Sequence, residues 1–171
     1  MARKYALDES DDTFLATASR RYVHDVDLSA PPGRVWKALC ADDALVSWSQ
    51  VITRVEWTSP RPFGVDTTRV VTLAGAVRLE ERFYRWNVDE RMTFTVDAAS
   101  VPGLRRFAED IALEKTTGGT RLTWTFALEG EPVLRPLLWL LDPANRILTS
   151  GIARGIGRRV GESPVPREAR K

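Results

Sequence analysis

The chain has 171 residues, of which 43% are hydrophobic and 28% charged; this composition is typical of a globular protein and excludes global disorder. Its 25 basic and 23 acidic residues are interleaved and give a net charge of +2, so the sequence does not indicate a nucleic-acid partner. One domain is expected at this length. A single cysteine, Cys40, and a single histidine, His24, exclude an intramolecular disulfide and a histidine-rich metal site.

The N-terminal segment, MARKYALDESDD, contains no apolar core of the kind that a secretory signal has. Near the C-terminus the longest apolar run contains Arg135 and Pro136 and is too short to cross a membrane. We therefore expect a cytoplasmic location and no integral membrane span. Residues 1–19 are expected to form a flexible arm, which could dock through Phe14 and Leu15.

The first strand is predicted at about residues 20–28, where apolar and polar residues alternate. His24 lies on its apolar face, either as a hydrogen-bonded core residue or as a proton donor or acceptor at the edge of a pocket. Ser29 and the two prolines that follow indicate the start of a short helix. A second short helix is expected over residues 42–48, with Trp48 near the mouth of a cavity.

Six further strands are predicted between turns rich in glycine, proline, asparagine and aspartate. They cover roughly residues 50–58, 67–74, 76–87, 91–98, 106–115 and 120–129. Their tight connections favour antiparallel hairpins. Because helices and strands are segregated along the chain, the fold class is expected to be α+β.

A long C-terminal helix is predicted over residues 131–160, whose apolar residues recur at three-, four- and seven-residue steps. Pro143 predicts a kink or break near Asp142. Gly151 and Gly155 share a face, which indicates either close backbone packing or room for a ligand. We expect a seven-stranded antiparallel sheet to curve around this helix and to leave a cavity beneath it.

Three stretches resemble the START-like (SRPBCC) superfamily and, within it, the polyketide cyclase/dehydrase branch. They are LSAPPGRVWKAL at 28–39, EERFYRW at 80–86 followed by RMTF at 91–94, and GGTRLTW at 118–124. The resemblance implies a START-like ligand-binding domain over residues 20–160 with a helix-grip fold, followed by a flexible tail at 161–171. It implies function only loosely, because the superfamily contains cyclases, lipid carriers and hormone receptors.

Alternation assigns the inner faces of most strands, but the strand at 76–87 leaves two alternatives. Hydrophobicity alone places Leu79, Glu81 and Phe83 inside, whereas the resemblance points Arg82 into the cavity. We follow the resemblance here; a register slip of one residue would reverse the assignment. The candidate ligand-binding residues are then His24, Trp48, Arg78, Glu80, Tyr84, Trp86, Phe94, Glu109 and Trp124.

An inward Arg82 would be a permanently charged donor that could polarise a ketone and stabilise an enolate. Arg82 is thus the candidate catalytic residue of a cofactor-independent polyketide cyclase or dehydratase. Alternatively, Arg82 and Arg78 pair with Glu80 or Glu109 in an ion-pair network without catalytic function.

The leading function is binding of a hydrophobic small molecule, polyketide-like or lipid-like, in the central cavity. Neither a cofactor nor a metal is expected. The alternatives are a non-enzymatic carrier of a lipid or metabolite and a protein-interaction module. Trp139, on the long helix, is either a core residue or a homodimer contact.

Overall fold

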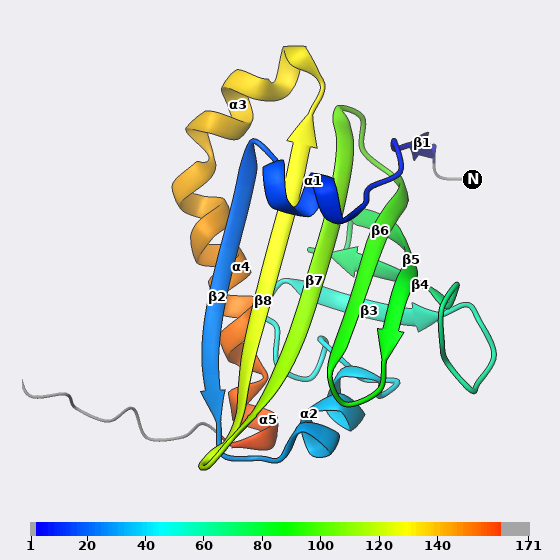
Figure 1. The fold of residues 1–171 in the computed structure, drawn as a ribbon. Coiled ribbons are helices and arrows are strands. Elements are labelled where there is room, and N and C mark those ends of the chain that lie inside the picture. The colour runs from blue at the N-terminus through cyan, green and yellow to red at the C-terminus, as the bar shows by residue number, and fades with distance from the viewer. Residues whose placement is uncertain (1–2, 162–171) are drawn as a thin grey trace, which may run out of the picture.

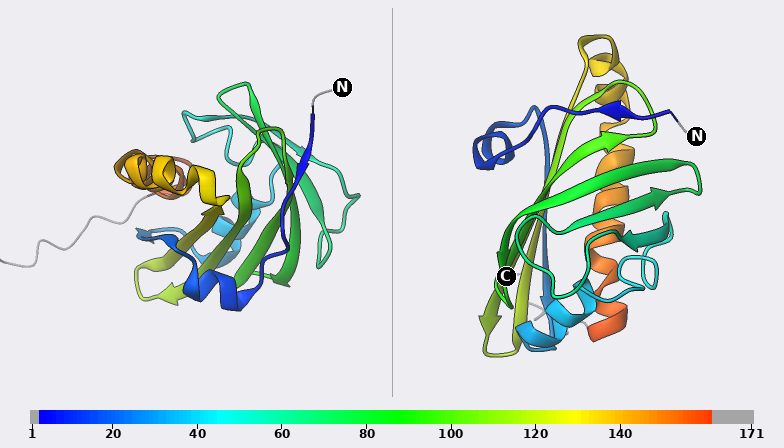
Figure 2. Two further views of the ribbon diagram at one scale, coloured as in Figure 1. Left: turned by 90° about the horizontal axis from the view of Figure 1, so that it is seen from above. Right: turned by 90° about the vertical axis from the view of Figure 1, so that its right-hand side faces the viewer.

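The computed structural model describes residues 3–161. The strands are β2 (Arg20–Leu28), β3 (Ile52–Trp57), β4 (Thr68–Leu73), β5 (Val77–Asn87), β6 (Arg91–Ala99), β7 (Leu104–Thr116) and β8 (Gly119–Gly130). They form an antiparallel sheet in the order β2-β8-β7-β6-β5-β4-β3, which curls into a half barrel (Figures 1 and 2). The predicted α+β class and the seven-stranded antiparallel sheet are confirmed.

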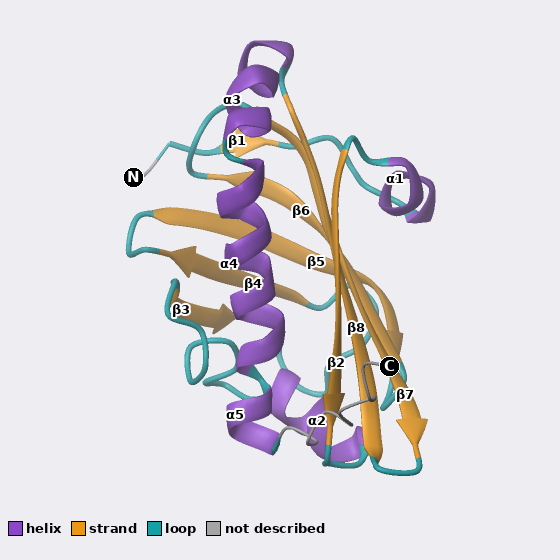
Figure 3. Ribbon diagram, turned by 90° about the vertical axis from the view of Figure 1, so that its left-hand side faces the viewer, coloured by secondary structure: helices purple, strands orange, loops and turns teal. Residues whose placement is uncertain are grey.

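The C-terminal helix lies across the concave face of the sheet (Figure 3) and is divided into segments. These are η1 (Pro132–Leu134), α3 (Arg135–Leu140), α4 (Asp142–Gly155) and α5 (Gly157–Val160). Pro143 lies in the first turn of α4, immediately after the break at Leu141. Because proline has no N–H and its ring clashes with the preceding turn, it cannot continue α3. The predicted break near Asp142 and the helix-grip arrangement are confirmed.

A short helix and a set of turns close one end of the half barrel. Helix α2 (Pro32–Leu39) buries Val35, Trp36 and Leu39. The short helix that we expected over residues 42–48 takes the form of consecutive turns, in which the Ser49 N–H donates to the Leu45 carbonyl over 2.7 Å. Trp48, in the last of these turns, is buried in the main core.

The N-terminal arm packs on the convex face of the sheet instead of remaining loose. Strand β1 (Tyr5–Ala6) pairs with β6, and helix α1 (Asp12–Thr17) crosses β7 and β8 (Figure 1). The side chain of Asp11 caps α1 by accepting the Phe14 N–H over 2.8 Å. Phe14 and Leu15, the docking residues that the sequence suggested, are buried against the sheet. Most of the expected tail, residues 162–171, lies outside the described residues.

Candidate ligand-binding site

A cavity of about 190 Å³ lies between the concave face of the sheet and the C-terminal helix. Most of its wall is apolar and comes from β4, β5, β7 and β8 on one side and α4 on the other. Val71, Leu79, Phe126, Leu148 and Ile152 are representative lining residues. The polar lining groups are Arg69, Glu81, Glu109, Trp124, Asn145 and Thr149. The site is therefore an apolar chamber with a small number of polar groups in its wall.

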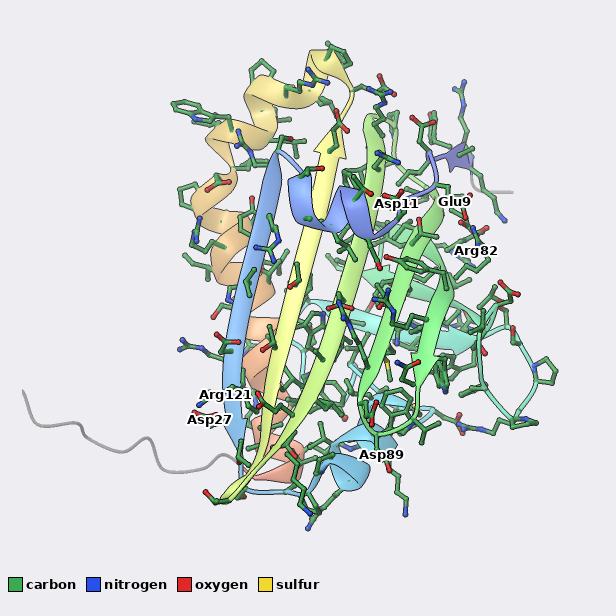
Figure 4. The ribbon with its side chains drawn as sticks, in the orientation of Figure 1. Glu9, Asp11, Asp27, Arg82, Asp89 and Arg121 are labelled. Carbon is green, nitrogen blue, oxygen red and sulfur yellow. The ribbon has the colours of Figure 1, made fainter. Side chains whose placement is uncertain are left out.

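The predicted inward orientation of Arg82 is wrong, because β5 turns its hydrophobic set inward. Leu79, Glu81 and Phe83 are buried, as hydrophobicity alone had indicated. Arg82 lies on the convex face, where its Nε donates to Asp97 over 2.9 Å and its Nη2 to Glu9 over 3.0 Å. Figure 4 shows Arg82 beside Glu9, on the side of the molecule away from the C-terminal helix. Arg82 therefore has no access to the cavity.

The convex face also carries three other predicted ligand-binding residues from β5. Arg78 is exposed, and Glu80 forms an ion pair with Lys4 of the arm. The Tyr84 hydroxyl donates to Asp12 over 3.2 Å, and burial raises the pKa of this phenol above its usual range. Glu80 and Tyr84 connect the sheet to the N-terminal arm, and none of the three residues lines the cavity.

Trp86 does lie on the inner face, although strict alternation along β5 would place it on the same face as Arg82. A register shift between Phe83 and Arg85 inserts a bulge into β5, and a bulge changes which residues point inward. Trp86 consequently packs edge-to-face on Phe83, at 5.0 Å between ring centroids, and on Trp36, at 5.3 Å. This aromatic cluster forms part of the core next to the cavity, without lining it.

A buried ion pair lies in the cavity wall. Arg69 of β4 donates through Nε to Glu81 of β5 over 2.5 Å, and both side chains are almost fully buried. Three aromatic rings surround the guanidinium: its Cζ atom lies 5.2 Å from the ring centroid of Trp57, 5.0 Å from that of Phe83 and 4.9 Å from that of Phe94. Cation–π attraction and the Glu81 carboxylate together balance the charge of Arg69.

Glu109 of β7 is the second buried carboxyl group of the cavity and accepts a hydrogen bond from the Trp124 indole N–H over 2.8 Å. Among residues 3–161 it forms no ion pair within 4.0 Å. Burial first, and the nearby charge of Glu81 second, raise the pKa of Glu109 to about 8. Burial raises the pKa of Glu81 as well, and the charge of Arg69 opposes this rise. Because Glu81 is paired with Arg69 and Glu109 is not, the geometry favours Glu109 as the carboxyl that holds a shared proton.

His24 lies behind the cavity wall and contacts it through a threonine. Its Nε2 is 2.8 Å from Oγ1 of Thr149, a hydroxyl that itself donates to the Asn145 carbonyl over 2.9 Å. When Thr149 donates to this carbonyl, its oxygen is free to accept a hydrogen bond from a His24 Nε2–H. Burial, followed by the charges of Arg154 and Arg146, lowers the pKa of His24. A neutral imidazole that holds a lining residue in position fits the hydrogen-bonded core alternative.

Of the predicted ligand-binding residues, the structure brings Glu109 and Trp124 together in the cavity wall. Phe94 is the cross-strand partner of Glu109, and its ring packs against Arg69 without lining the cavity. Trp48 is buried elsewhere in the core, where its indole N–H has no partner among the described residues. The sequence analysis does not identify Arg69, and it places Glu81 inside only in the alternative that follows hydrophobicity alone. The alternation of Arg69, Val71 and Leu73 in β4 is a signal that could have identified the inward arginine.

A second hollow, of about 560 Å³, runs along the outer flank of α4 beside residues 49–51. Leu148 and Ile152 line both this hollow and the cavity, so these two side chains separate them. The two predicted glycines differ. A Cβ atom at Gly155 would lie 2.6 Å from Cδ1 of Trp48, whereas one at Gly151 would meet no atom within 4 Å. Gly155 therefore permits close packing of α4 against Trp48, whereas Gly151 faces open space.

Other chemistries have little support within residues 3–161. No three histidine, cysteine, aspartate or glutamate side chains in this range are grouped to hold a metal ion. Burial raises the pKa of the Cys40 thiol to about 12, which leaves it protonated and weakly nucleophilic. No helix in the same range combines the length and hydrophobicity needed to cross a membrane.

Comparison with known proteins gives consistent results for sequence and fold. The family model described as "Polyketide cyclase / dehydrase and lipid transport" matches residues 19–158. An uncharacterized protein of Mycobacterium tuberculosis is 35% identical over 154 residues, which cover 90% of this chain and 92% of that protein. A protein of Mycobacterium bovis matches with the same identity and coverage.

Two solved structures share the fold. TTHA0849 from Thermus thermophilus superposes with a TM-score of 0.68 at 19% identity, over 82% of this chain and 96% of that chain. A START superfamily protein from Mycobacterium smegmatis gives a TM-score of 0.67 at 12% identity, over 83% and 97%. These two similarities show the fold, and the family match over residues 19–158 shows that the chain belongs to the polyketide cyclase/dehydrase and lipid transport family.

Proposed function

We propose that the chain binds a small hydrophobic molecule in the cavity between the sheet and the C-terminal helix. The observation that carries this proposal is a cavity of about 190 Å³ with an apolar wall and a few polar groups, the usual character of a small-molecule site. Family and fold suggest hydrophobic ligands as well. An interaction module would need no such cavity, and this alternative is therefore less favoured.

The volume limits the size of the ligand. A cavity of about 150 Å³ is known to admit a benzene molecule, so 190 Å³ suits a molecule with one aromatic ring or a short acyl chain. A polycyclic polyketide would need α4 to move away from the sheet. Leu148 and Ile152 separate the cavity from the outer hollow. A movement of α4 would therefore enlarge the cavity at these two residues.

Catalysis of a cyclisation or dehydration is the second candidate function, and Glu109 favours it. A carboxyl group that keeps its proton near neutral pH can act as a general acid. In a dehydration it would give its proton to the departing hydroxyl group, which leaves as water, and the ligand would supply the proton that restores the acid. A non-enzymatic carrier requires only the cavity and none of this chemistry.

Native mass spectrometry of the purified protein, followed by organic extraction and analysis of the extract, tests the binding proposal. We expect a retained hydrophobic molecule, or uptake of ethylbenzene when it is added. Leu128→Trp places a larger side chain in the cavity wall and should abolish uptake, whereas Leu140→Trp, at an exposed position of α3, should not affect it. Absence of uptake by the folded wild-type protein would refute the proposal.

A further inference from the structure

The buried charges of the cavity wall determine which ligands can enter. Arg69, Glu81 and Glu109 come from β4, β5 and β7 and line one chamber. A buried charge is tolerated when an opposite charge pairs with it and is costly when it is alone. One cation is available for two carboxyl groups, so the balance among these three side chains sets the charge that a ligand encounters.

The guanidinium of Arg69 is already balanced. Glu81 accepts its Nε–H over 2.5 Å, and the rings of Trp57, Phe83 and Phe94 surround it. A ligand carboxylate would therefore add a negative charge to a low-dielectric chamber in which Arg69, the one cation among the described lining residues, is already paired with Glu81. The free-energy cost of that added charge is substantial.

Glu109 offers the opposite property, a proton to donate. One of its oxygens, Oε2, accepts the Trp124 indole N–H over 2.8 Å, and its backbone lies opposite Phe94 and Phe126 in the sheet. The protonated carboxyl retains an O–H that can be donated to a ligand. An acceptor atom of the ligand would satisfy this donor, whereas a hydrocarbon would leave it without a partner.

The remaining groups around the cavity do not supply a counter-charge. Asn145 and Thr149 of α4 are uncharged lining residues. His24 of β2 lies behind Thr149, and burial lowers its pKa, which favours the neutral imidazole. Arg154 of α4 lines the outer hollow instead of the cavity.

We propose that the cavity selects uncharged ligands that carry a hydrogen-bond acceptor, such as the carbonyl of a ketone or ester, and rejects the corresponding carboxylates. This inference rests on the proposed function and names the ligand class for the same site. A free fatty acid or aromatic acid would be excluded, while an aromatic ketone, an acyl ester or an aldehyde of similar size would be accepted. Glu109 is the residue that makes the distinction, and the Arg69–Glu81 pair maintains it.

Three probes of nearly equal size test the proposal: acetophenone, ethylbenzene and benzoate. Their affinities can be measured by calorimetry or ligand-detected NMR at about pH 6, where benzoate is an anion. We expect acetophenone to bind about tenfold more tightly than ethylbenzene, and benzoate to bind at least about a hundredfold more weakly than acetophenone. Equal binding of benzoate, or equal binding of ethylbenzene, would overturn the proposal without affecting cavity binding. If none of the three probes binds, the proposed function itself fails.

The pH profile and two variants identify the donor. Acetophenone has no titrating group, so any change of its affinity with pH reports the ionisation of a protein group. We expect the affinity to fall above about pH 8, where Glu109 ionises. Glu109→Gln keeps a donor and should bind acetophenone with an affinity that does not change with pH; Glu109→Leu should lose the preference over ethylbenzene. Glu114→Gln, an exposed carboxyl on the same strand, should retain the wild-type profile. A profile for Glu109→Gln identical to that of the wild type would contradict the assignment of the donor.

Discussion

At Glu109, a carboxyl group without a paired cation remains in the core because it keeps its proton. The pKa rises from its ordinary value of 4.5 to about 8 in the fold, while the unfolded chain ionises normally. Between these values the native state holds a proton that the unfolded state has released. The protonated Glu109 therefore contributes its full share to the free energy of unfolding below about pH 4.5, and this share is lost as the pH rises toward 8.

Urea unfolding of the wild type and of Glu109→Gln tests this linkage. Glutamine cannot ionise, so the variant should gain stability relative to the wild type as the pH rises from about 5 to 8. One pKa unit corresponds to about 1.4 kcal/mol, and a relative gain on the order of 2–4 kcal/mol is expected. Glu114→Gln is the exposed control. A relative stability of Glu109→Gln that stays constant over this range would show that Glu109 is ionised in the fold.

The two arginines of β4 and β5 should differ sharply when they are replaced. Arg69→Met leaves Glu81 as a buried, unpaired carboxylate and should destabilise the fold by about 3–5 kcal/mol. Arg82→Met removes a partly exposed pair with Glu9 and Asp97 and should cost less than about 1 kcal/mol. Chemical denaturation of both variants measures the difference, and equal losses would contradict the placement of Arg82 on the convex face.

These residues also show the limits of sequence reasoning. Glu109 and Trp124 could be predicted because β7 and β8 alternate regularly around these two positions, beyond the register shift at the start of β7. The family resemblance points Arg82 inward, whereas the apolar pattern of Leu79 and Phe83 predicts the orientation that β5 adopts. The inward position of Trp86 depends on a bulge, and alternation alone cannot reveal an inserted residue.

Among the elements, the C-terminal helix agrees well with its prediction from the sequence, including the break near Asp142. Proline at 143 imposed the break because its backbone nitrogen has no hydrogen to donate. The N-terminal arm was harder to predict, since α1 has only six residues and is too short to be stable alone. Its order comes from the burial of Phe14 and Leu15 on β7 and β8, a tertiary contact that local sequence does not specify.

The two glycines of α4 provide a matched test of its packing. Gly155→Ala should destabilise the fold by about 1–3 kcal/mol, because the new Cβ would lie 2.6 Å from Cδ1 of Trp48 and 2.9 Å from its carbonyl oxygen. Gly151→Ala meets no neighbour and should stabilise the helix by up to about 1 kcal/mol. Thermal unfolding distinguishes the two, and stabilisation by Gly155→Ala would show that α4 lies farther from Trp48.

In the whole molecule, a half-barrel sheet and a broken helix enclose a chamber that neither could form alone. The order and alternation of the strands predicted this enclosure, but not its volume, because side-chain packing across the cavity decides how much space remains. At about 190 Å³, the chamber suits ligands with one aromatic ring or a short acyl chain, which are smaller than a polycyclic polyketide. The chemistry of its wall depends on Arg69, Glu81 and Glu109, which line one chamber although β6 separates β7 from β5 in the sheet.

The most direct test of ligand binding inside this chamber is an NMR titration that follows the tryptophan indole N–H signals as acetophenone is added, with Trp124→Phe and Trp139→Phe to assign two of them. The Trp124 signal should shift, because its N–H is bonded to Glu109 in the cavity wall. The signal of Trp139, which is 69% exposed on α3, should not move. A shift confined to Trp139, or no shift at saturating ligand, would contradict binding in the central cavity.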